Sequence, residues 1–301
     1  MKTIVLLSSY NGEKFIKAQL DSIIAQTAEN VEILVRDDGS ADNTLGILSE
    51  YSDKGHLNYY TGRNIGAAAS FWELLQKSGD ADYYAFCDQD DVWDSDKLEK
   101  AQRCLSDKNA ALPLLYCGDV RVADSELNVL SDTMTVPERC DYPFSLIKNI
   151  APGCTFVFNR RAKEVLCRYD ARKLGIYQHD WLAYQIVSCF GEVCFDREPH
   201  MYYRQHDNNV IGAVKNIGAE RIRKAFEFMF GRKKHLREQL AKRLLSAYTA
   251  DMNEENRELT EMIADYRKST VYKKRILRAD EFKFNGIDHL FFRLLIIFDL
   301  F

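Results

Sequence analysis

The 301-residue sequence predicts an α/β domain built on a mostly parallel β-sheet, followed by a helical C-terminal region. In about the first 120 residues, short apolar runs alternate with longer runs at helical spacing, as in strands joined by crossover helices. From about residue 214 onward, strand-like runs are lacking. The charge changes at the same place, because residues 1–213 carry a net −10 and residues 214–301 a net +6. We therefore expect a domain at 1–212 and a helical region at 213–301.

The expected strands are short apolar runs, and the expected helices between them carry apolar residues three or four positions apart. We expect strands at residues 4–7, 31–35, 57–60, 83–87 and 114–117. We expect helices at residues 13–26, 42–48, 67–76 and 96–105, with a mixed region of loops, strands and helices up to about residue 209. This alternation predicts a sheet that is covered by helices on both faces.

Three of the expected strands are followed by loops rich in small polar and acidic residues. These loops are residues 8–11 (SSYN), 36–40 (RDDGS) and 88–91 (DQDD). Since the carboxyl ends of parallel strands meet at one edge of the sheet, the three loops can converge on one ligand. Three carboxylates within four positions repel one another, and a divalent cation such as Mg²⁺ or Mn²⁺ would relieve that repulsion while binding phosphate oxygens. Such a cation also neutralises charge on a diphosphate leaving group.

A purely structural role is the alternative for each acidic loop. An Asp-Gly sequence such as Asp38-Gly39 is commonly a turn or a helix cap. The loop at 88–91 favours a site instead, because it follows a fully apolar run and places Asp90 next to Asp91-Val92-Trp93. A carboxylate beside a large aromatic ring is more typical of a site wall than of a solvent loop.

In combination and in this order, the motifs resemble glycosyltransferase family 2, whose catalytic domain has the GT-A fold. The resemblance is close over about residues 1–120 and looser over 120–212. It is carried by Ser8-Ser9-Tyr10-Asn11-Gly12, Gln26-Thr27, the run from Val35 to Thr44, Arg63-Asn64-Ile65-Gly66 and the Asp-x-Asp element Asp88-Gln89-Asp90-Asp91.

The resemblance implies roles for individual residues. Asp38 would accept a hydrogen bond from the pyrimidine N3–H, and Asp88 would contact the ribose. Asp90 would bind a divalent metal that bridges the diphosphate, with Asp91 and His206 as further candidate ligands. The nucleotide-binding residues that the resemblance implies are Ser8, Tyr10, Asp38, Arg63 and Asp88.

Asp180 is the candidate catalytic base, because an acceptor hydroxyl is a poor nucleophile until a positioned carboxylate removes its proton. It opens an apolar helix at 181–190 and matches the position of the catalytic Asp in the family, although His179 stands where many members have an acid. With Asp180 as base, transfer would be a single displacement with inversion. An Asp at a helix start is also a good N-cap, and the two roles are compatible.

The segment Tyr203-Arg204-Gln205-His206 resembles one found in bacterial rhamnosyltransferase-like members, as does Asp88-Gln89-Asp90-Asp91-Val92-Trp93. The resemblance implies a dTDP- or UDP-linked sugar as donor, with dTDP-rhamnose favoured. It further implies a glycan or lipid-linked acceptor in the synthesis of a cell-surface polysaccharide. His206 would contact the metal or a phosphate, although a single histidine is more often structural.

The C-terminal region is basic and aromatic at residues 219–245 and strongly apolar at 287–301. Both features are typical of helices that lie on an anionic membrane surface, and also of helices that pack on the catalytic domain or on a second subunit of a homodimer. No run of about 20 apolar residues predicts a transmembrane helix. The lack of an export signal and of Cys-x-x-Cys pairs indicates a cytoplasmic protein with reduced thiols.

Two other functions share part of this pattern. A nucleotidyltransferase also uses metal-bound carboxylates, but it usually needs a glycine-rich basic loop where this sequence has Ser9-Tyr10-Asn11-Gly12-Glu13. A non-catalytic sugar-nucleotide-binding scaffold would not need both Asp90 and Asp180. Nucleic acid is an improbable partner because the first 213 residues are acidic and contain no recognition motif.

Overall fold

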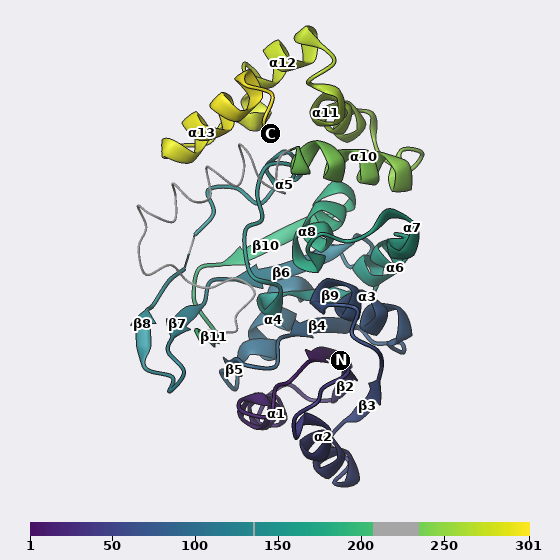
Figure 1. The fold of residues 1–301 in the computed structure, drawn as a ribbon, viewed down its shortest axis with the longest axis vertical. Helices are drawn as coiled ribbons and strands as arrows, with labels where there is room; N and C mark the ends of the chain where they lie inside the picture. The colour runs from purple at the N-terminus through teal and green to yellow at the C-terminus, as the bar shows by residue number, and fades with distance from the viewer. Residues whose placement is uncertain (135, 207–234) are drawn as a thin grey trace. The chain divides into compact units, whose positions relative to one another are not determined.

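A computed structural model describes residues 1–134, 136–206 and 235–301. Contacts along the chain divide it into two compact units (Figure 1). The first comprises Met1–Val136 and Asn149–Gly212, and the second comprises Pro137–Lys148 and Ala213–Phe301. The boundary expected at residues 212–213 lies outside the described residues. The assignment of residues 137–148 to the second unit has no counterpart in the sequence analysis.

The first unit is built on a seven-stranded sheet in the order β10-β6-β9-β4-β1-β2-β3. Its strands are parallel except β9, which runs antiparallel to both β4 and β6. The strands are β1 (Thr3–Ser9), β2 (Val31–Asp37), β3 (Asn58–Thr61), β4 (Tyr83–Cys87), β6 (Leu114–Gly118), β9 (Val157–Asn159) and β10 (Glu192–Asp196). The predicted mostly parallel sheet is therefore confirmed.

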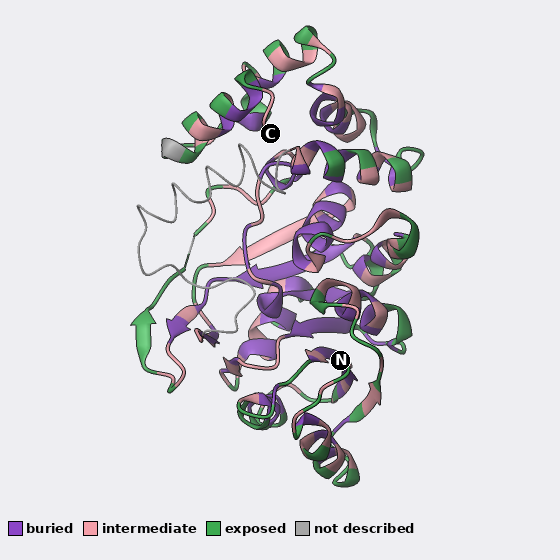
Figure 2. Ribbon diagram, viewed as in Figure 1, coloured by how far each residue is buried: buried purple, intermediate pink, exposed green. Residues whose placement is uncertain are grey.

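The central strands of this sheet form the hydrophobic core of the first unit. Val5 of β1 pairs with Ile33 of β2 on one side and with Ala85 of β4 on the other. All residues of β4 are buried, as Figure 2 shows by its purple colour. A strand buried on both faces reads as a continuous apolar run rather than an alternating one, which is why 83–87 was recognisable from sequence.

Helices cover both faces of this sheet. Successive side chains of a strand point to opposite faces. Phe86 of β4 meets Phe71 of α3, while Cys87 accepts a hydrogen bond from Gln19 of α1. Helices α1 and α3 therefore lie on opposite faces. The helical elements of this unit are α1 (Ile16–Ile24), α2 (Thr44–Asp53), α3 (Ala67–Lys77), α4 (Lys97–Ser106), η1 (Gly153–Thr155), α6 (Arg160–Cys167), α7 (Ala171–Leu174) and α8 (His179–Phe190).

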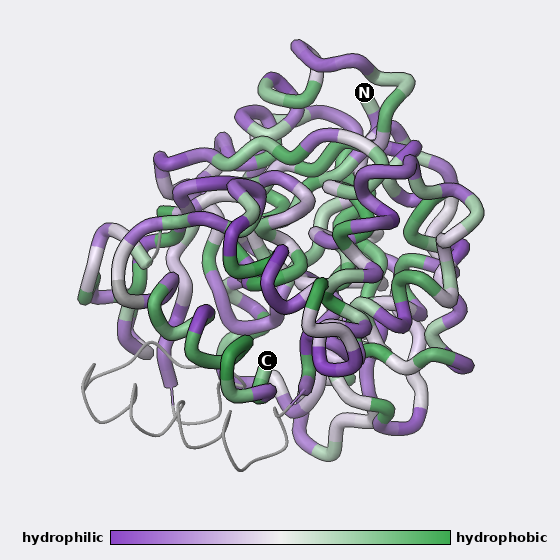
Figure 3. Tube along the Cα trace, turned by 90° about the horizontal axis from the view of Figure 1, so that it is seen from above, coloured by the Kyte–Doolittle hydropathy of each residue, from purple (hydrophilic) through white to green (hydrophobic). Residues whose placement is uncertain are grey.

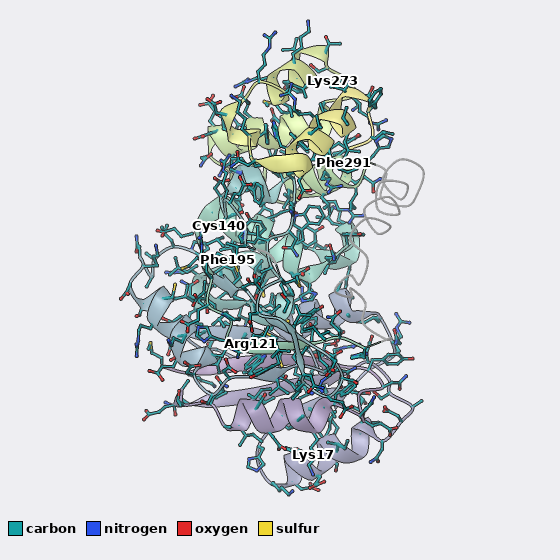
Figure 4. All side chains as sticks on the ribbon, turned by 90° about the vertical axis from the view of Figure 1, so that its left-hand side faces the viewer. Lys17, Arg121, Cys140, Phe195, Lys273 and Phe291 are labelled. Carbon is teal, nitrogen blue, oxygen red and sulfur yellow. The ribbon has the colours of Figure 1, made fainter. Side chains whose placement is uncertain are left out.

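A second, four-stranded sheet in the order β5-β11-β7-β8 lies in the same unit. Its strands are β5 (Val92–Trp93), β7 (Arg121–Ala123), β8 (Val129–Ser131) and β11 (Met201–Arg204). Arg121, labelled in Figure 4, forms an ion pair with Asp94 just after β5. Because β11 pairs with β5, the residues after β11 are carried next to the loop between β4 and β5. The sequence did not predict this sheet.

The second unit is helical, as predicted for the C-terminal region. Within it, the hydroxyls of Tyr142 and Thr260 lie 2.6 Å apart, and the buried Glu238 accepts hydrogen bonds from Arg267. Its elements are α5 (Tyr142–Ser145), α10 (Leu236–Tyr248), α11 (Glu254–Asp265), α12 (Thr270–Ile276), η2 (Asp280–Phe282) and α13 (Gly286–Ile297).

Helix α13 is the most apolar part of the second unit, and Figure 3 colours much of it green. Four apolar side chains on it are exposed, namely Leu290, Leu294, Ile297 and Phe298 just after its end. Their spacing of four, three and one places them along one stripe. Among the described residues, no helix is both long and apolar enough to cross a bilayer. Most of the basic segment 219–245, residues 219–234, lies outside the described residues.

Candidate active site

The first two polar loops are joined by hydrogen bonds. The N–H of Asp38 donates to the carbonyl of Ser9 at 2.7 Å, continuing the pairing of β1 with β2 beyond the strands. The N–H of Asn11 donates to Ser40 Oγ at 2.8 Å, and the Asn11 side chain accepts from the N–H of Ala41 at 2.8 Å. The residues at 8–11 and 36–41 thus form one connected surface at the carboxyl ends of β1 and β2.

Gln89 joins the first loop to the third. Its Oε1 accepts from the N–H of Tyr10 at 2.9 Å, and its Nε2 donates to the carbonyl of Tyr10 at 3.0 Å. A Cβ added at Gly12 would lie 2.2 Å from Gln89 Oε1, so a side chain at residue 12 would displace Gln89 from this position. The three strand ends therefore converge, as the parallel sheet predicted.

Asp37 builds the turn of the second loop. Its carboxylate accepts hydrogen bonds from the N–H groups of Gly39 and Ser40 and from the hydroxyls of Ser9 and Ser40. Gly39 has a φ of +85°, in the left-handed region that glycine adopts without strain. The loop therefore forms a turn, and the side chain that stabilises the turn is that of Asp37.

Asp38 is buried against Arg36 and the chain after β3. Arg36 Nη1 donates to Asp38 Oδ1 at 2.5 Å, and the N–H groups of Ile65 and Gly66 also donate to this carboxylate. Arg36 additionally donates to the carbonyl of Arg63 at 3.1 Å. Most hydrogen-bond acceptor positions of the Asp38 carboxylate are therefore occupied by donors of the protein itself. Its contact with a pyrimidine stays a prediction, and its visible effect is to hold residues 63–66 beside β2.

The other nucleotide-binding candidates differ in exposure. Ser8 Oγ lies 2.6 Å from Ser70 Oγ of α3, which in turn accepts from Arg36. Tyr10 is exposed beside Gln89, so its ring is accessible to a ligand. The side chain of Arg63 is exposed too, and no described contact joins it to the acidic residues after β4.

The acidic residues after β4 form a crowded group. Ligand atoms of Asp88, Asp91 and Cys154 all lie within 4.8 Å of one another. Burial, and then the charges of Asp90 and Asp180, raise the pKa of Asp88 to about 7. Burial, and then Asp90 and Asp88, raise the pKa of Asp91 well above its ordinary value. These carboxyls are poorly neutralised by the protein alone, which is the environment that a divalent cation stabilises.

Asp90 pairs with His206, the residue two positions after β11. His206 Nε2 lies 2.8 Å from Asp90 Oδ2, and the imidazole stacks on Phe15 at 4.9 Å. Arg204 stabilises the same loop through two hydrogen bonds. Its side-chain Nε donates to the carbonyl of Asp90 at 2.7 Å, and its backbone N–H donates to Asp91 Oδ1 at 3.1 Å. Two of the proposed metal ligands thus lie side by side.

Lys97 is a buried cation behind this group, with an exposed fraction of 2%. Its Nζ donates to the carbonyl of Cys154 at 2.9 Å and lies 3.4 Å from the centroid of the Trp93 ring. Burial lowers the pKa of Lys97 to about 8, against the attraction of Cys154, Cys87, Asp91 and Asp88. This lysine fixes the η1 turn and offsets part of the negative charge.

Asp180 lies in the first turn of α8 and is 7% exposed. Its charge is among those that raise the pKa of Asp88, so the two carboxyls lie in one electrostatic environment. Asn149 Nδ2 donates to Asp180 Oδ2 at 2.9 Å. The charge of the candidate base thus acts on Asp88, which lies 92 positions earlier in the sequence.

The surroundings of His179 account for a histidine, rather than an acidic residue, at the start of α8. Its ring stacks on Phe71 at 4.1 Å and meets Phe86 edge-on at 5.1 Å. Burial lowers the pKa of His179, which keeps the imidazole neutral at pH 7. A Cβ on Gly153 would lie 2.5 Å from His179 Nε2 and 3.1 Å from Asp180 Cβ. The aromatic setting favours a neutral ring over a second carboxylate here.

Six residues of this site were not singled out from the sequence. Gln89 and Arg36 lie inside recognised motifs, but nothing in the motifs shows that they bridge loops. Asn149, Lys97 and Cys154 act across the fold and carry no local signal. The residues missed are Arg36, Gln89, Lys97, Asn149, Cys154 and Arg204, the last of which was named only as part of its segment.

Comparison with known proteins places the chain in a family. The model of the family described as "Glycosyl transferase family 2" matches residues 4–162. The "dTDP-rhamnosyl transferase RfbG" of Shigella flexneri is 34% identical over 223 residues, covering 69% of this chain and 74% of that protein. The "UDP-Glc:alpha-D-GlcNAc-diphosphoundecaprenol beta-1,3-glucosyltransferase WfgD" of Escherichia coli is 31% identical over 157 residues, covering 52% of this chain and 59% of that protein.

Solved structures show the same fold. The crystal structure of S. aureus TarS 1-349 in complex with UDP-GlcNAc superposes with a TM-score of 0.59 at 14% identity. The match covers 99% of this chain and 82% of that chain. By its strand-end motifs, its family match and its relatives, the chain belongs to glycosyltransferase family 2: it is a glycosyltransferase with a GT-A fold, similar to bacterial rhamnosyltransferases.

Proposed function

We propose that this protein is an inverting, metal-dependent transferase that moves a sugar from a nucleoside diphosphate to an acceptor hydroxyl. The observation that carries the proposal is the packing around η1. Ligand atoms of Cys154, Asp88 and Asp91 lie within 4.8 Å of one another, and a Cβ on the neighbouring Gly153 would lie 3.1 Å from Asp180 Cβ. This arrangement supports a site that holds both a diphosphate-binding acidic group and a base. Inverting transfer requires both of them around a single sugar.

The residues present fit a divalent cation. Asp91 Oδ2 is buried and receives no N–H or O–H hydrogen bond from the described part of the chain. Asp88 lies with Asp91 and Cys154 in a group whose ligand atoms are within 4.8 Å of one another, and carboxylate oxygens are the ligands that Mn²⁺ and Mg²⁺ prefer. Asp90 is paired with His206 beside this group, so a cation bound there would replace the hydrogen bond between the two side chains. We propose Asp90 as the principal ligand, with Asp91 and His206 as further ligands. A bound cation would neutralise negative charge on the departing diphosphate.

The remaining chemistry falls to residues of the chain. Asp180 accepts the proton of the acceptor hydroxyl as the oxygen attacks the anomeric carbon from the face opposite the diphosphate. The bond from that carbon to the phosphate oxygen breaks, and its electron pair leaves with the nucleoside diphosphate. Ser8, Tyr10, Asp38, Arg63 and Asp88 are proposed to hold the nucleoside and ribose.

The donor is proposed to be a dTDP- or UDP-linked sugar, with dTDP-rhamnose favoured. The support is the name of the 34% identical relative, a dTDP-rhamnosyl transferase, together with the segment Tyr203-Arg204-Gln205-His206. For the acceptor we propose a glycan or lipid-linked glycan of a cell-surface polysaccharide. WfgD, by its name, acts on a diphosphoundecaprenol-linked sugar.

A lipid-linked acceptor would place this enzyme at a membrane surface on the cytoplasmic side. The apolar stripe of α13, formed by Leu290, Leu294, Ile297 and Phe298, is proposed as the contact with lipid. Apolar side chains on one face of a helix bury themselves at the boundary of headgroups and acyl chains. A homodimer through the same stripe is the other outcome that an experiment must separate.

The proposal is tested with the full chain and a panel of dTDP- and UDP-sugars, with and without Mn²⁺. We expect one donor to raise the melting temperature only when Mn²⁺ is present, because a ligand that binds the native state stabilises it. With that donor and a polysaccharide-repeat acceptor, we expect a glycoside of inverted anomeric configuration by NMR. Retained configuration, or full transfer in a metal chelator, would contradict the proposal.

A further inference from the structure

The carboxylate of Asp180 is held by two hydrogen bonds of different origin. Its Oδ1 accepts from the N–H of Trp181 in its own helix at 2.8 Å. Its Oδ2 accepts from Nδ2 of Asn149, a residue 31 positions earlier, at 2.9 Å. The first bond is local to α8, whereas the second depends on the tertiary structure.

The orientation of the Asn149 amide is determined by its own surroundings. Its Oδ1 accepts from the N–H of Ile150 at 3.0 Å, which leaves the NH₂ group to face Asp180. A flipped amide would place its oxygen against the carboxylate and would lose the bond to Ile150. Donation by Asn149 to Asp180 is therefore the only favourable arrangement.

The backbone around Asp180 is already fixed. His179 is stacked on Phe71, and Gly153 leaves no room for a side chain between η1 and the start of α8. Rotation of the carboxylate about its last bond has a weak intrinsic preference, so hydrogen bonds decide its orientation. The Trp181 N–H restrains Oδ1, and Asn149 supplies the second hydrogen bond, which fixes Oδ2.

We propose that Asn149 is a positioning residue for the catalytic base, holding the Asp180 carboxylate in one orientation toward the acceptor hydroxyl. The inference rests on the proposed role of Asp180 as base. Catalytic groups act efficiently only near one geometry, and a misplacement of about 1 Å can cost on the order of 100-fold in rate. The bond also uses part of the carboxylate, which leaves fewer orientations for proton transfer.

The test compares Asn149→Ala, Asn149→Asp and Asn149→Leu with the wild type in the full chain. Asn149→Leu keeps nearly the same shape but removes the donor, whereas Asn149→Asp replaces the neutral donor with a second carboxyl that competes with Asp180 for a proton. We expect all three variants to lower kcat by about 10- to 100-fold, with KM for the donor sugar and the affinity for UDP or dTDP unchanged. Wild-type kcat in Asn149→Asp and Asn149→Leu would overturn the proposal.

The matched control is Asn128→Ala. Asn128 Nδ2 donates to Asp124 Oδ2 at 3.0 Å in the same kind of amide–carboxylate pair, but this pair is exposed and lies outside the proposed site. We expect wild-type kcat from this control. A loss equal to that of Asn149→Ala would show that the assay reports general destabilisation, and would overturn the specific role of Asn149.

A double-mutant cycle separates positioning from folding. If Asn149 acts through Asp180, then Asn149→Ala causes no further loss of residual activity in the Asp180→Asn background. An additive loss, or weaker nucleotide binding in both backgrounds, indicates a merely structural role and overturns the proposal. Wild-type transfer by Asp180→Asn would remove the base assignment itself. Loss in Asp180→Asn with full activity in Asn149→Ala would remove only this inference.

Discussion

Gln89 and Tyr10 exchange two hydrogen bonds, in which the Tyr10 N–H donates to Gln89 Oε1 at 2.9 Å and Gln89 Nε2 donates to the Tyr10 carbonyl at 3.0 Å. This pair joins the loop expected to bind the base to the loop expected to bind the metal. Gln89, the middle residue of the Asp-x-Asp element, therefore connects the two loops. We expect the binding of the donor nucleotide to depend on this connection.

Gln89→Ala is expected to weaken binding of the nucleoside diphosphate by up to about 30-fold, because two hydrogen bonds of about 1 kcal/mol each no longer align the loops. Isothermal titration of UDP or dTDP with Mn²⁺ measures the change. Gln239→Ala, on the exposed side of α10, is the control and should bind as the wild type does. Equal affinities in all three proteins would argue against the clamp.

Asp180→Asn is expected to lower transfer by about 100- to 10,000-fold, because an amide cannot accept the proton of the acceptor hydroxyl. The nearly identical shape of the amide should leave nucleotide binding largely intact. Initial rates with saturating donor and a thermal-shift titration measure the two effects. Wild-type turnover in the variant would remove Asp180 from the mechanism.

Asp90→Ala is expected to remove the gain in nucleotide affinity that Mn²⁺ provides, while leaving the affinity without metal nearly unchanged. The reason is that Asp90 is the proposed metal ligand and is paired with His206 at 2.8 Å. Titrations of UDP or dTDP with and without Mn²⁺ give the comparison. Asp107→Ala, at the exposed end of α4, should behave as the wild type. An unchanged Mn²⁺ effect in Asp90→Ala would be evidence against this ligand.

The metal-free protein is expected to become less stable as pH rises from about 4 to about 7. Asp88 keeps its proton in the folded protein up to its raised pKa of about 7, whereas an unfolded Asp loses it near 3.8. Between these values the folded state binds more protons, so the free energy of unfolding falls with rising pH. Asp88→Asn should reduce this slope in thermal melts with chelator. An identical slope in both proteins would contradict the raised pKa.

Replacing Leu290, Leu294 and Phe298 together with Ser is expected to abolish cosedimentation with phosphatidylglycerol vesicles. The exposed stripe supplies the apolar area that would enter the lipid surface, and Phe298 alone is 65% exposed. Val271→Ser removes an equally exposed apolar side chain from α12 and should not affect sedimentation. If the wild type does not sediment with vesicles but elutes as a dimer, and the triple variant elutes as a monomer, the stripe is a subunit interface.

The local pattern of the sequence predicted much of the fold. The apolar run at 83–87 and the runs near β1, β2 and β6 were visible because strands buried on both faces are continuously apolar. The convergence of their carboxyl ends followed from parallel pairing alone. The antiparallel insertion of β9 and the small second sheet were not visible, because strands of two to four residues carry too little periodicity.

By itself, the sequence determined the family, the parallel sheet, the acidic strand end and the candidate base, since each is written in consecutive residues. Only the tertiary structure decided which side chains hold that chemistry in place. Gln89 reaches Tyr10 across 79 positions, Lys97 reaches Cys154 across 57, and Asn149 reaches Asp180 across 31. Contacts between distant residues depend on how the backbone brings them together, and no local propensity or spacing encodes a hydrogen bond of that kind.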